Sequence, residues 1–149
     1  MDWYLAHVIW VNAGWLTFVA CMVLAIWKGG PTEKRGAALI ATGCLLSPVL
    51  TRFDGPGPGL YVQALDTLLT LGFVALALQS RRLWVFVICM CSLNGLITYF
   101  VTGYEAFSMY AFVTATGFWL GYAWQLCLIF GVIDYQRTLR RQSDTPKPA

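Results

Sequence analysis

Asp66 is the residue whose type and position could do chemistry, because it is an acidic residue inside a long apolar run. Gln63, Asp66, Thr67 and Thr70 follow one another at i, i+3, i+4 and i+7, a spacing that places all four on one face of a helix. An ionised carboxylate in hydrocarbon is costly, so Asp66 should be neutral, paired or facing a wet cavity. The stripe therefore predicts a polar surface that faces the interior of a helix bundle.

Other apolar runs offer polar side chains at a similar depth, namely His7 and Asn12 in the first run and Asn94 in the fourth. If each run rises 1.5 Å per residue, His7 should lie about 6 Å and Asp66 about 9 Å below the same membrane surface. Two interpretations stay open. In one, Asp66 anchors a ligand in a small polar cavity open to the outside, with His7 as its proton partner. In the other, these side chains form a buried hydrogen-bond network that holds the helices together.

Four of the seven tryptophans lie well inside the apolar runs, whereas an interfacial belt would place them at the ends: Trp10, Trp15, Trp119 and Trp124. A buried indole N–H needs a partner, so these side chains should face other helices, lipid carbonyls or a ligand. Packing between helices and a ligand-binding role are therefore both compatible with their positions.

The remaining reactive residues do not form a recognisable centre. The five cysteines all lie in apolar runs without a C-x-x-C pair, at Cys21, Cys44, Cys89, Cys91 and Cys127. With a single histidine and no clustered carboxylates, the sequence predicts no metal site. One Asp and one His also give too little acid–base machinery for a membrane enzyme. We therefore expect no catalytic residue, no cofactor and buried, unreactive thiols.

The elements that position these residues follow from the composition of the chain. Of its 149 residues, 58% are hydrophobic and 11% are charged, whereas a soluble domain carries about a quarter charged residues. The mean hydropathy is +0.64. Apolar runs in lipid default to helices, and these do not alternate as barrel strands do. We predict a single all-α transmembrane domain over residues 1–149, which excludes large aqueous-domain enzymes, nucleic-acid-binding proteins and disulfide scaffolds.

Charges and Gly/Pro breaks delimit five spans, at about 3–27, 36–51, 60–78, 83–101 and 107–133. The second is the shortest, and Pro48 near its end could kink it or end it early. Residues 134–149 should form a basic segment followed by a disordered tail.

Five spans place nine of the ten basic residues on one side of the membrane, with Arg52 alone on the other. By the positive-inside rule that side is cytoplasmic, so the N-terminus should be outside and the C-terminus inside. Omitting the second span would put Lys28, Lys34 and Arg35 opposite the basic residues of the C-terminal tail. The charge pattern therefore favours five spans over four.

Two further patterns concern contacts with neighbours. Gly117 and Gly121 form a G-x-x-x-G spacing that lets another helix approach closely. That helix could belong to this chain, to a second copy or to another membrane protein. Arg137, Arg140 and Arg141 share one helix face if the fifth span continues as a helix. They are then either anionic-lipid ligands or simply determinants of topology.

The tract LALQSRRLW (Leu76 to Trp84), following a span that contains an Asp, resembles a hairpin in a family of uncharacterised small polytopic membrane proteins of alphaproteobacteria. The resemblance covers about half of the chain, from Asp66 to Asp134. The Trp-Pro pair and the histidine of the family's fourth span are missing here. It implies a location in the bacterial inner membrane and no particular activity.

Two classes of function remain open. The first is a non-catalytic accessory or assembly subunit of a larger membrane complex, whose partner is another membrane protein or a second copy. The second is a small ligand- or lipid-binding transporter or sensor, with an outward-facing polar cavity around Asp66. Both place the chain in a lipid bilayer without a nucleic-acid partner. A wet pocket holding Asp66 would favour the binding protein, and a long apolar face without an internal cavity would favour the subunit.

Overall fold

The computed structural model describes residues 3–54, 59–101 and 114–143, with side chains from Val8 onward, and these stretches are almost entirely helical. Its elements are α1 (Trp3–Lys28), α2 (Pro31–Asp54), α3 (Leu60–Ser80), α4 (Leu83–Val101), η1 (Phe118–Tyr122) and α6 (Ala123–Ser143). Residues 114–117 are helical and lead into η1, so the last two elements belong to one long helix. Five helices in the described chain are long and apolar enough to cross a membrane, which confirms the predicted all-α membrane class.

The second helix is longer than the predicted span 36–51. It begins at Pro31, where proline has no intrahelical bond to lose, and it continues through Pro48 to Asp54. Pro48 has no backbone N–H, so α2 lacks one hydrogen bond, the bond to the carbonyl of Cys44. Because α2 packs against α3 along its length, that loss does not end the helix.

The fifth helix also exceeds the predicted span 107–133, since α6 ends at Ser143. The predicted start at 107 and the tail beyond Ser143 lie outside the described residues. The helical continuation puts Arg137, Arg140 and Arg141 on one exposed face of α6. Binding of anionic lipid at this face stays a prediction.

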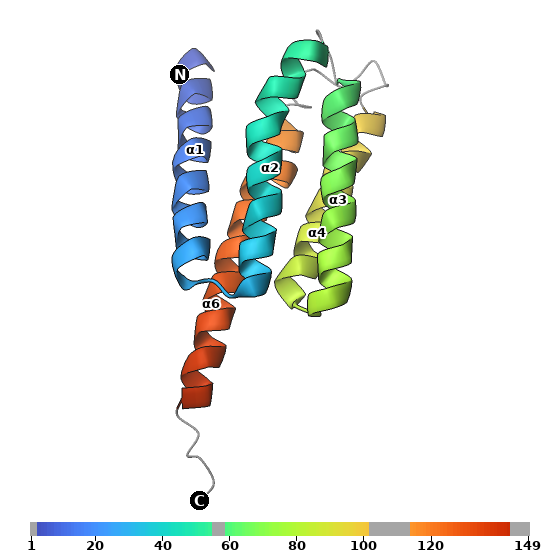
Figure 1. Ribbon diagram of the computed structural model, residues 1–149. Helices are drawn as coiled ribbons and strands as arrows, with labels where there is room; N and C mark the ends of the chain where they lie inside the picture. The colour runs from blue at the N-terminus through green and yellow to red at the C-terminus, as the bar shows by residue number, and fades with distance from the viewer. Residues whose placement is uncertain (1–2, 55–58, 102–113, 144–149) are drawn as a thin grey trace, which may run out of the picture.

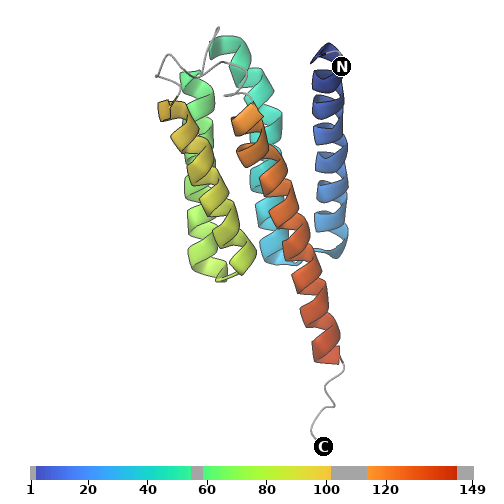
Figure 2. The same cartoon turned by 180° about the vertical axis from the view of Figure 1, so that it is seen from behind.

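The helices form a ring in which α2, α3, α4 and α6 pack in that order and α1 closes the ring against α6 and α2 (Figures 1 and 2). A further contact between α2 and α6 runs across the ring. Its centre is filled by large side chains that are almost fully buried, including Phe73, Ile88, Trp124 and Leu128. Many large apolar side chains remain exposed around the ring, as expected of helices that face lipid.

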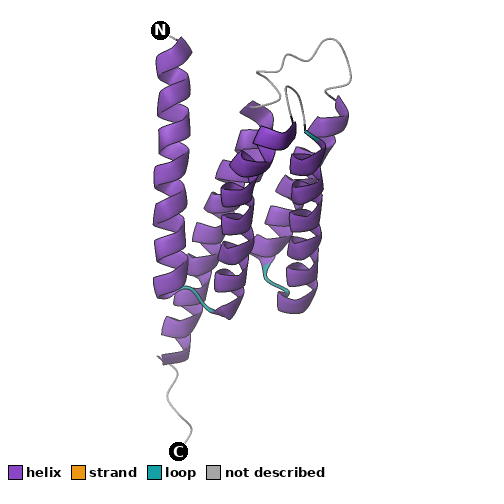
Figure 3. Cartoon of the chain, turned by 45° about the horizontal axis from the view of Figure 1, so that its top comes forward, coloured by secondary structure: helices purple, strands orange, loops and turns teal. Residues whose placement is uncertain are grey.

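Apart from Arg52, in the last turn of α2, the basic residues of the described chain gather at one end of the ring. Turns α1–α2 and α3–α4 lie there together with the last turns of α6, and we call it the basic end (Figure 3). The opposite end, which we call the Asp54 end, holds the start of α1, the end of α2 and the start of α3. The separation of charge agrees with the predicted topology. Which side of the membrane each end faces stays a prediction.

Trp84 joins three helices at the basic end. Its indole Nε1 donates to Glu33 Oε1 at 3.3 Å, and both side chains are buried, with exposed fractions of 7% and 1%. A methyl group on Gly36 would come within 2.7 Å of the indole, and so would one on Gly131. Two glycines, one on α2 and one on α6, thus make the space that Trp84 of α4 fills.

We expect Gly131→Ala to destabilise the protein, because its new methyl group would overlap a buried ring that cannot move aside. Overpacking of this kind costs about 1–3 kcal/mol in the free energy of unfolding. The matched control is Gly121→Ala, since a Cβ at Gly121 meets no described atom within 4 Å. Thermal unfolding in detergent, followed by circular dichroism, checks the difference. Equal stability of the two variants would show that the contact at Trp84 is not tight.

Candidate functional site

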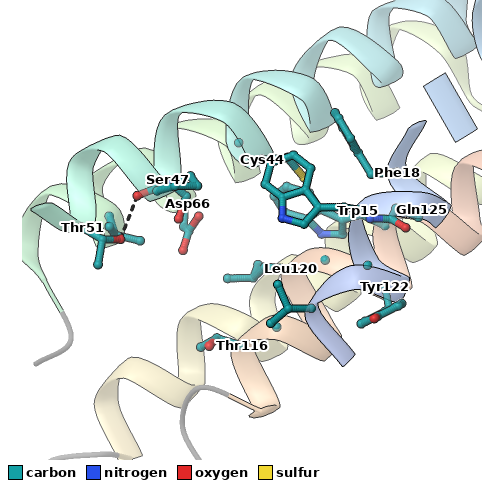
Figure 4. A pocket seen from close by; sticks show the side chains of 18 of the residues that line it. Trp15, Phe18, Cys44, Ser47, Thr51, Asp66, Thr116, Leu120, Tyr122 and Gln125 are labelled. Carbon is teal, nitrogen blue, oxygen red and sulfur yellow. Dashed lines mark hydrogen bonds between the residues drawn. The ribbon is translucent and has the colours of Figure 1, made fainter. Parts of the chain in front are cut away.

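A cavity of about 480 Å³ opens in the half of the ring nearer the Asp54 end. Every spanning helix contributes side chains to it, and ten of the lining residues are labelled in Figure 4. The wall is mostly apolar and aromatic, with a small number of polar groups. Both the volume and this lining match small-molecule sites, which range from roughly 300 to 1,000 Å³.

Asp66 of α3 faces this pocket from a buried position, with an exposed fraction of 7%. Its Oδ2 accepts a hydrogen bond of 2.6 Å from the hydroxyl of Tyr99 on α4. The ion pair found among the described residues joins Arg82 to Asp134 and leaves Asp66 without a basic partner in that part of the chain. Asp66 is therefore an acidic group inside a spanning helix, and among the described residues the hydroxyl of Tyr99 is the donor that holds its carboxylate.

The other members of the polar stripe do not line the pocket. Thr70 is buried, but its hydroxyl donates to the Asp66 carbonyl at 2.7 Å. Thr67 is exposed, and its hydroxyl donates to the Gln63 carbonyl at 2.8 Å. Gln63 is half-buried. Both hydroxyls donate to backbone carbonyls of α3. Of the four residues in the stripe, Asp66 therefore lines the pocket.

The partners expected from other helices are not those that the structure brings to Asp66. Asn12 is exposed and donates to the carbonyl of Val8 at 2.8 Å, and Asn94 is also exposed. Neither lines the pocket. The side chain of His7 lies outside the described residues. Tyr99 could be singled out from the sequence only by its position near the end of a span, where an interfacial belt also accounts for it.

Three of the four deep tryptophans line the pocket, namely Trp10 and Trp15 of α1 and Trp124 of α6. Trp124 also packs edge-on against Phe73, with ring centroids 5.0 Å apart. Trp119 packs against the buried core instead. The structure therefore gives these tryptophans both of the roles that their positions allow, ring packing and a pocket wall.

One side of the pocket is formed by a π-helical turn. In η1 the N–H of Ala123 donates to the carbonyl of Phe118, five residues earlier. Such turns are frequent at functional sites because they redirect side chains. Gly117 and Gly121 lie in or beside this turn and both line the pocket.

The two glycines are not at a close helix–helix contact within the described chain. A Cβ at Gly121 would meet no described atom within 4 Å, and one at Gly117 would meet only Trp10 Nε1, at 3.9 Å. Packing between helices of this chain, one of the roles expected of the G-x-x-x-G spacing, is therefore not found there. Packing against a second copy or another protein stays a prediction.

A hydrogen bond ties the π-helical turn to α1. The hydroxyl of Tyr122 donates to the carbonyl of Trp10 at 2.5 Å, and their rings lie 4.6 Å apart. Gly14, one turn along α1, allows this approach, since a Cβ there would lie 3.2 Å from the Tyr122 hydroxyl. This contact fixes α1 beside the pocket, although α1 is the least buried of the spanning helices.

Asp54 stabilises the rim of the pocket at the Asp54 end. Its two carboxylate oxygens accept hydrogen bonds from the backbone N–H groups of Tyr61, at 2.9 Å, and Val62, at 3.0 Å. Asp54 thus caps the N-terminus of α3 from the end of α2. Gly59 is required for this approach, because a Cβ there would lie 1.9 Å from the Asp54 carboxylate.

Several polar groups of the wall lack their usual partners. Trp124 Nε1 and Gln125 Oε1 are buried and have no hydrogen bond to any described residue. Pro48 cannot donate to the carbonyl of Cys44, and both residues line the pocket. Within the described chain no group of three or more His, Cys, Asp or Glu side chains could hold a metal ion. The pocket is suited to an organic molecule that can make hydrogen bonds.

No protein-family model, curated protein or solved structure matches this chain.

Replacing Tyr99 by Phe should destabilise the protein, because Oδ2 of Asp66 then loses its donor in a buried site. The expected cost is about 1–3 kcal/mol in the free energy of unfolding. Tyr61→Phe is the matched control, since Tyr61 is 56% exposed on the same side of the bundle. Thermal unfolding of both variants in detergent makes the comparison. An equal loss in the two would mean that the Tyr99 hydroxyl does not hold Asp66.

Proposed function

We propose that this protein binds a small, largely apolar molecule in the pocket at the Asp54 end and acts as a membrane transporter or sensor. The observation that carries the proposal is the cavity of about 480 Å³ with Asp66 in its wall. A carboxylate is costly inside a spanning helix, and polar residues in such positions mark substrate and ion pathways. Asp66 is the polar anchor of the site, and the aromatic wall supplies the apolar contact.

The pocket is also the reason to prefer a binding protein over an accessory subunit. Helices that serve only to pack against a partner have no need of an internal cavity, and cavities are destabilising when they stay empty. Several features work together to keep this one open. They are the π-helical turn η1, the proline within α2 and the absence of a side chain at Gly121.

The proposed setting follows from the charge distribution and from the sequence resemblance. With the basic end in the cytoplasm, the pocket lies in the outer half of a bacterial inner membrane and opens to the outside. A ligand would reach it from that surface or from the outer leaflet.

A variant that fills the pocket should abolish binding. In Gly121→Leu the added side chain would occupy open space, so the protein should fold while the pocket is blocked. Ala64→Leu is the matched control, because Ala64 is exposed on α3 and lines no part of the pocket. We expect native mass spectrometry of protein gently extracted from host membranes to show a small-molecule adduct on the wild type and on Ala64→Leu, and none on Gly121→Leu.

Two results would contradict the proposal. The first is an adduct that survives equally in Gly121→Leu, which would place the bound molecule elsewhere on the protein. The second is a wild type without any adduct but with a stoichiometric larger protein attached. That result would establish the accessory-subunit function and leave Asp66 as part of the bundle's packing.

A further inference from the structure

The charged groups of the pocket are all acidic. Among the described lining residues there is no Lys, Arg or His, while Asp54 and Asp66 are both present. Asp54 already uses both carboxylate oxygens at the N-terminus of α3. Asp66 has one bond to a described residue, from the Tyr99 hydroxyl to Oδ2, which leaves Oδ1 for another donor. Within the described part of the chain, the wall thus presents one carboxylate that lacks a counter-cation.

The unpartnered polar groups of the described wall include two acceptors and one donor, Trp124 Nε1. The carbonyl of Cys44 has lost its usual donor to Pro48, and Gln125 Oε1 is unpartnered among the described residues. Trp10, Trp15 and Trp124 add aromatic rings to the same wall, and aromatic faces attract cations. The Asp66 carboxylate, the unpartnered acceptors and the aromatic rings together favour a cationic guest.

The size and the lining of the pocket separate an organic cation from a metal ion. A metal ion needs several oxygen, nitrogen or sulfur ligands close together, and the described residues form no such group. A cavity of about 480 Å³ with a mainly apolar wall holds a molecule with an apolar body instead. An anionic guest would bring a second negative charge to Asp66 without a basic group to offset it.

We infer that the ligand is a lipophilic amine, whose ammonium group binds Asp66 and whose apolar body lies along the aromatic wall of the pocket. This inference rests on the proposed function and names the ligand class of the same site. The amine is a free molecule rather than a phospholipid headgroup. The phosphate beside a headgroup amine would meet Asp54 and Asp66 with no basic residue among the described lining residues to hold it.

The test compares probes that share a twelve-carbon chain and differ in charge. Dodecylamine, dodecanol and dodecanoate are titrated onto the protein in phosphatidylcholine nanodiscs, with empty nanodiscs as the baseline. We expect dodecylamine to bind the wild type about tenfold or more tightly than either of the other two. A lysophosphatidylethanolamine of the same chain length should bind more weakly than dodecylamine. Tighter binding of that lipid would overturn the assignment to a free amine.

Two substitutions of the same kind separate anchoring from general attraction. Asp66→Asn keeps an acceptor for the Tyr99 hydroxyl but removes the charge, and should lower dodecylamine affinity about tenfold or more while leaving dodecanol affinity unchanged. Asp134→Asn removes the same charge from an exposed position on α6 that does not line the pocket, and should leave the preference for the amine intact. Equal losses in both variants would show attraction by net charge without an anchor, and would overturn the inference.

The failure of this inference can be told apart from failure of the proposed function. Suppose that dodecanol or dodecanoate binds the wild type as tightly as dodecylamine, and that Gly121→Leu blocks this binding. The pocket is then a binding site, as proposed, and the assignment of the ligand to the amines is wrong. The amine class is also wrong if none of the probes binds. In that case the small-molecule adduct in native mass spectrometry still tests whether the pocket binds a ligand. If Gly121→Leu leaves the binding of every probe unchanged, binding occurs outside the pocket and both proposals fail.

Discussion

The close approach of α2, α4 and α6 around Trp84 is the constraint on which the rest of the bundle depends. Gly36 and Gly131 carry no side chain, so the indole of Trp84 fits between their helices and donates to the buried Glu33. Lipid offers helices no hydrophobic driving force to associate, and such packing and hydrogen bonding must supply it. With three helices held together at the basic end, the opposite half can contain a cavity without loss of the overall arrangement.

The cavity persists because the backbone, rather than the side chains alone, keeps the helices from closing over it. Pro48 in α2 and the π-helical turn η1 both interrupt the regular hydrogen-bond ladder at the pocket wall. The Tyr122 hydroxyl then fixes α1 against that turn. The carbonyl of Cys44 at the pocket wall thereby loses the donor that a regular helix would supply.

Properties that act residue by residue along the chain could be predicted from the sequence. The hydropathy pattern predicted five membrane-spanning helices, and five helices in the described chain are long and apolar enough to span. The polar stripe predicted that Asp66 faces the interior, and Asp66 is buried. The pairs Asp66–Tyr99 and Glu33–Trp84 could not be predicted, because they depend on how neighbouring helices rotate and cross. In the sequence Glu33 lies among the charged residues of a predicted turn, so its burial could not be predicted. The G-x-x-x-G spacing could not show that Gly117 and Gly121 line the pocket, since spacing alone does not say which face of a helix meets another helix of the chain and which meets a cavity.

The π-helical turn has a consequence for how this chain can change by insertion and deletion. A turn that spans five residues in place of four holds one residue more than an α-helix would. Each residue of an α-helix turns the chain by about 100°. If the same residues formed a regular α-helix, Thr116 and Gly117 would be rotated by about this angle relative to Gly131, which packs against Trp84, whereas loss of one residue from η1 would restore an α-helical turn and keep both halves in register. The length of this one turn sets the angular register between the half of the helix that closes the bundle and the half that lines the pocket.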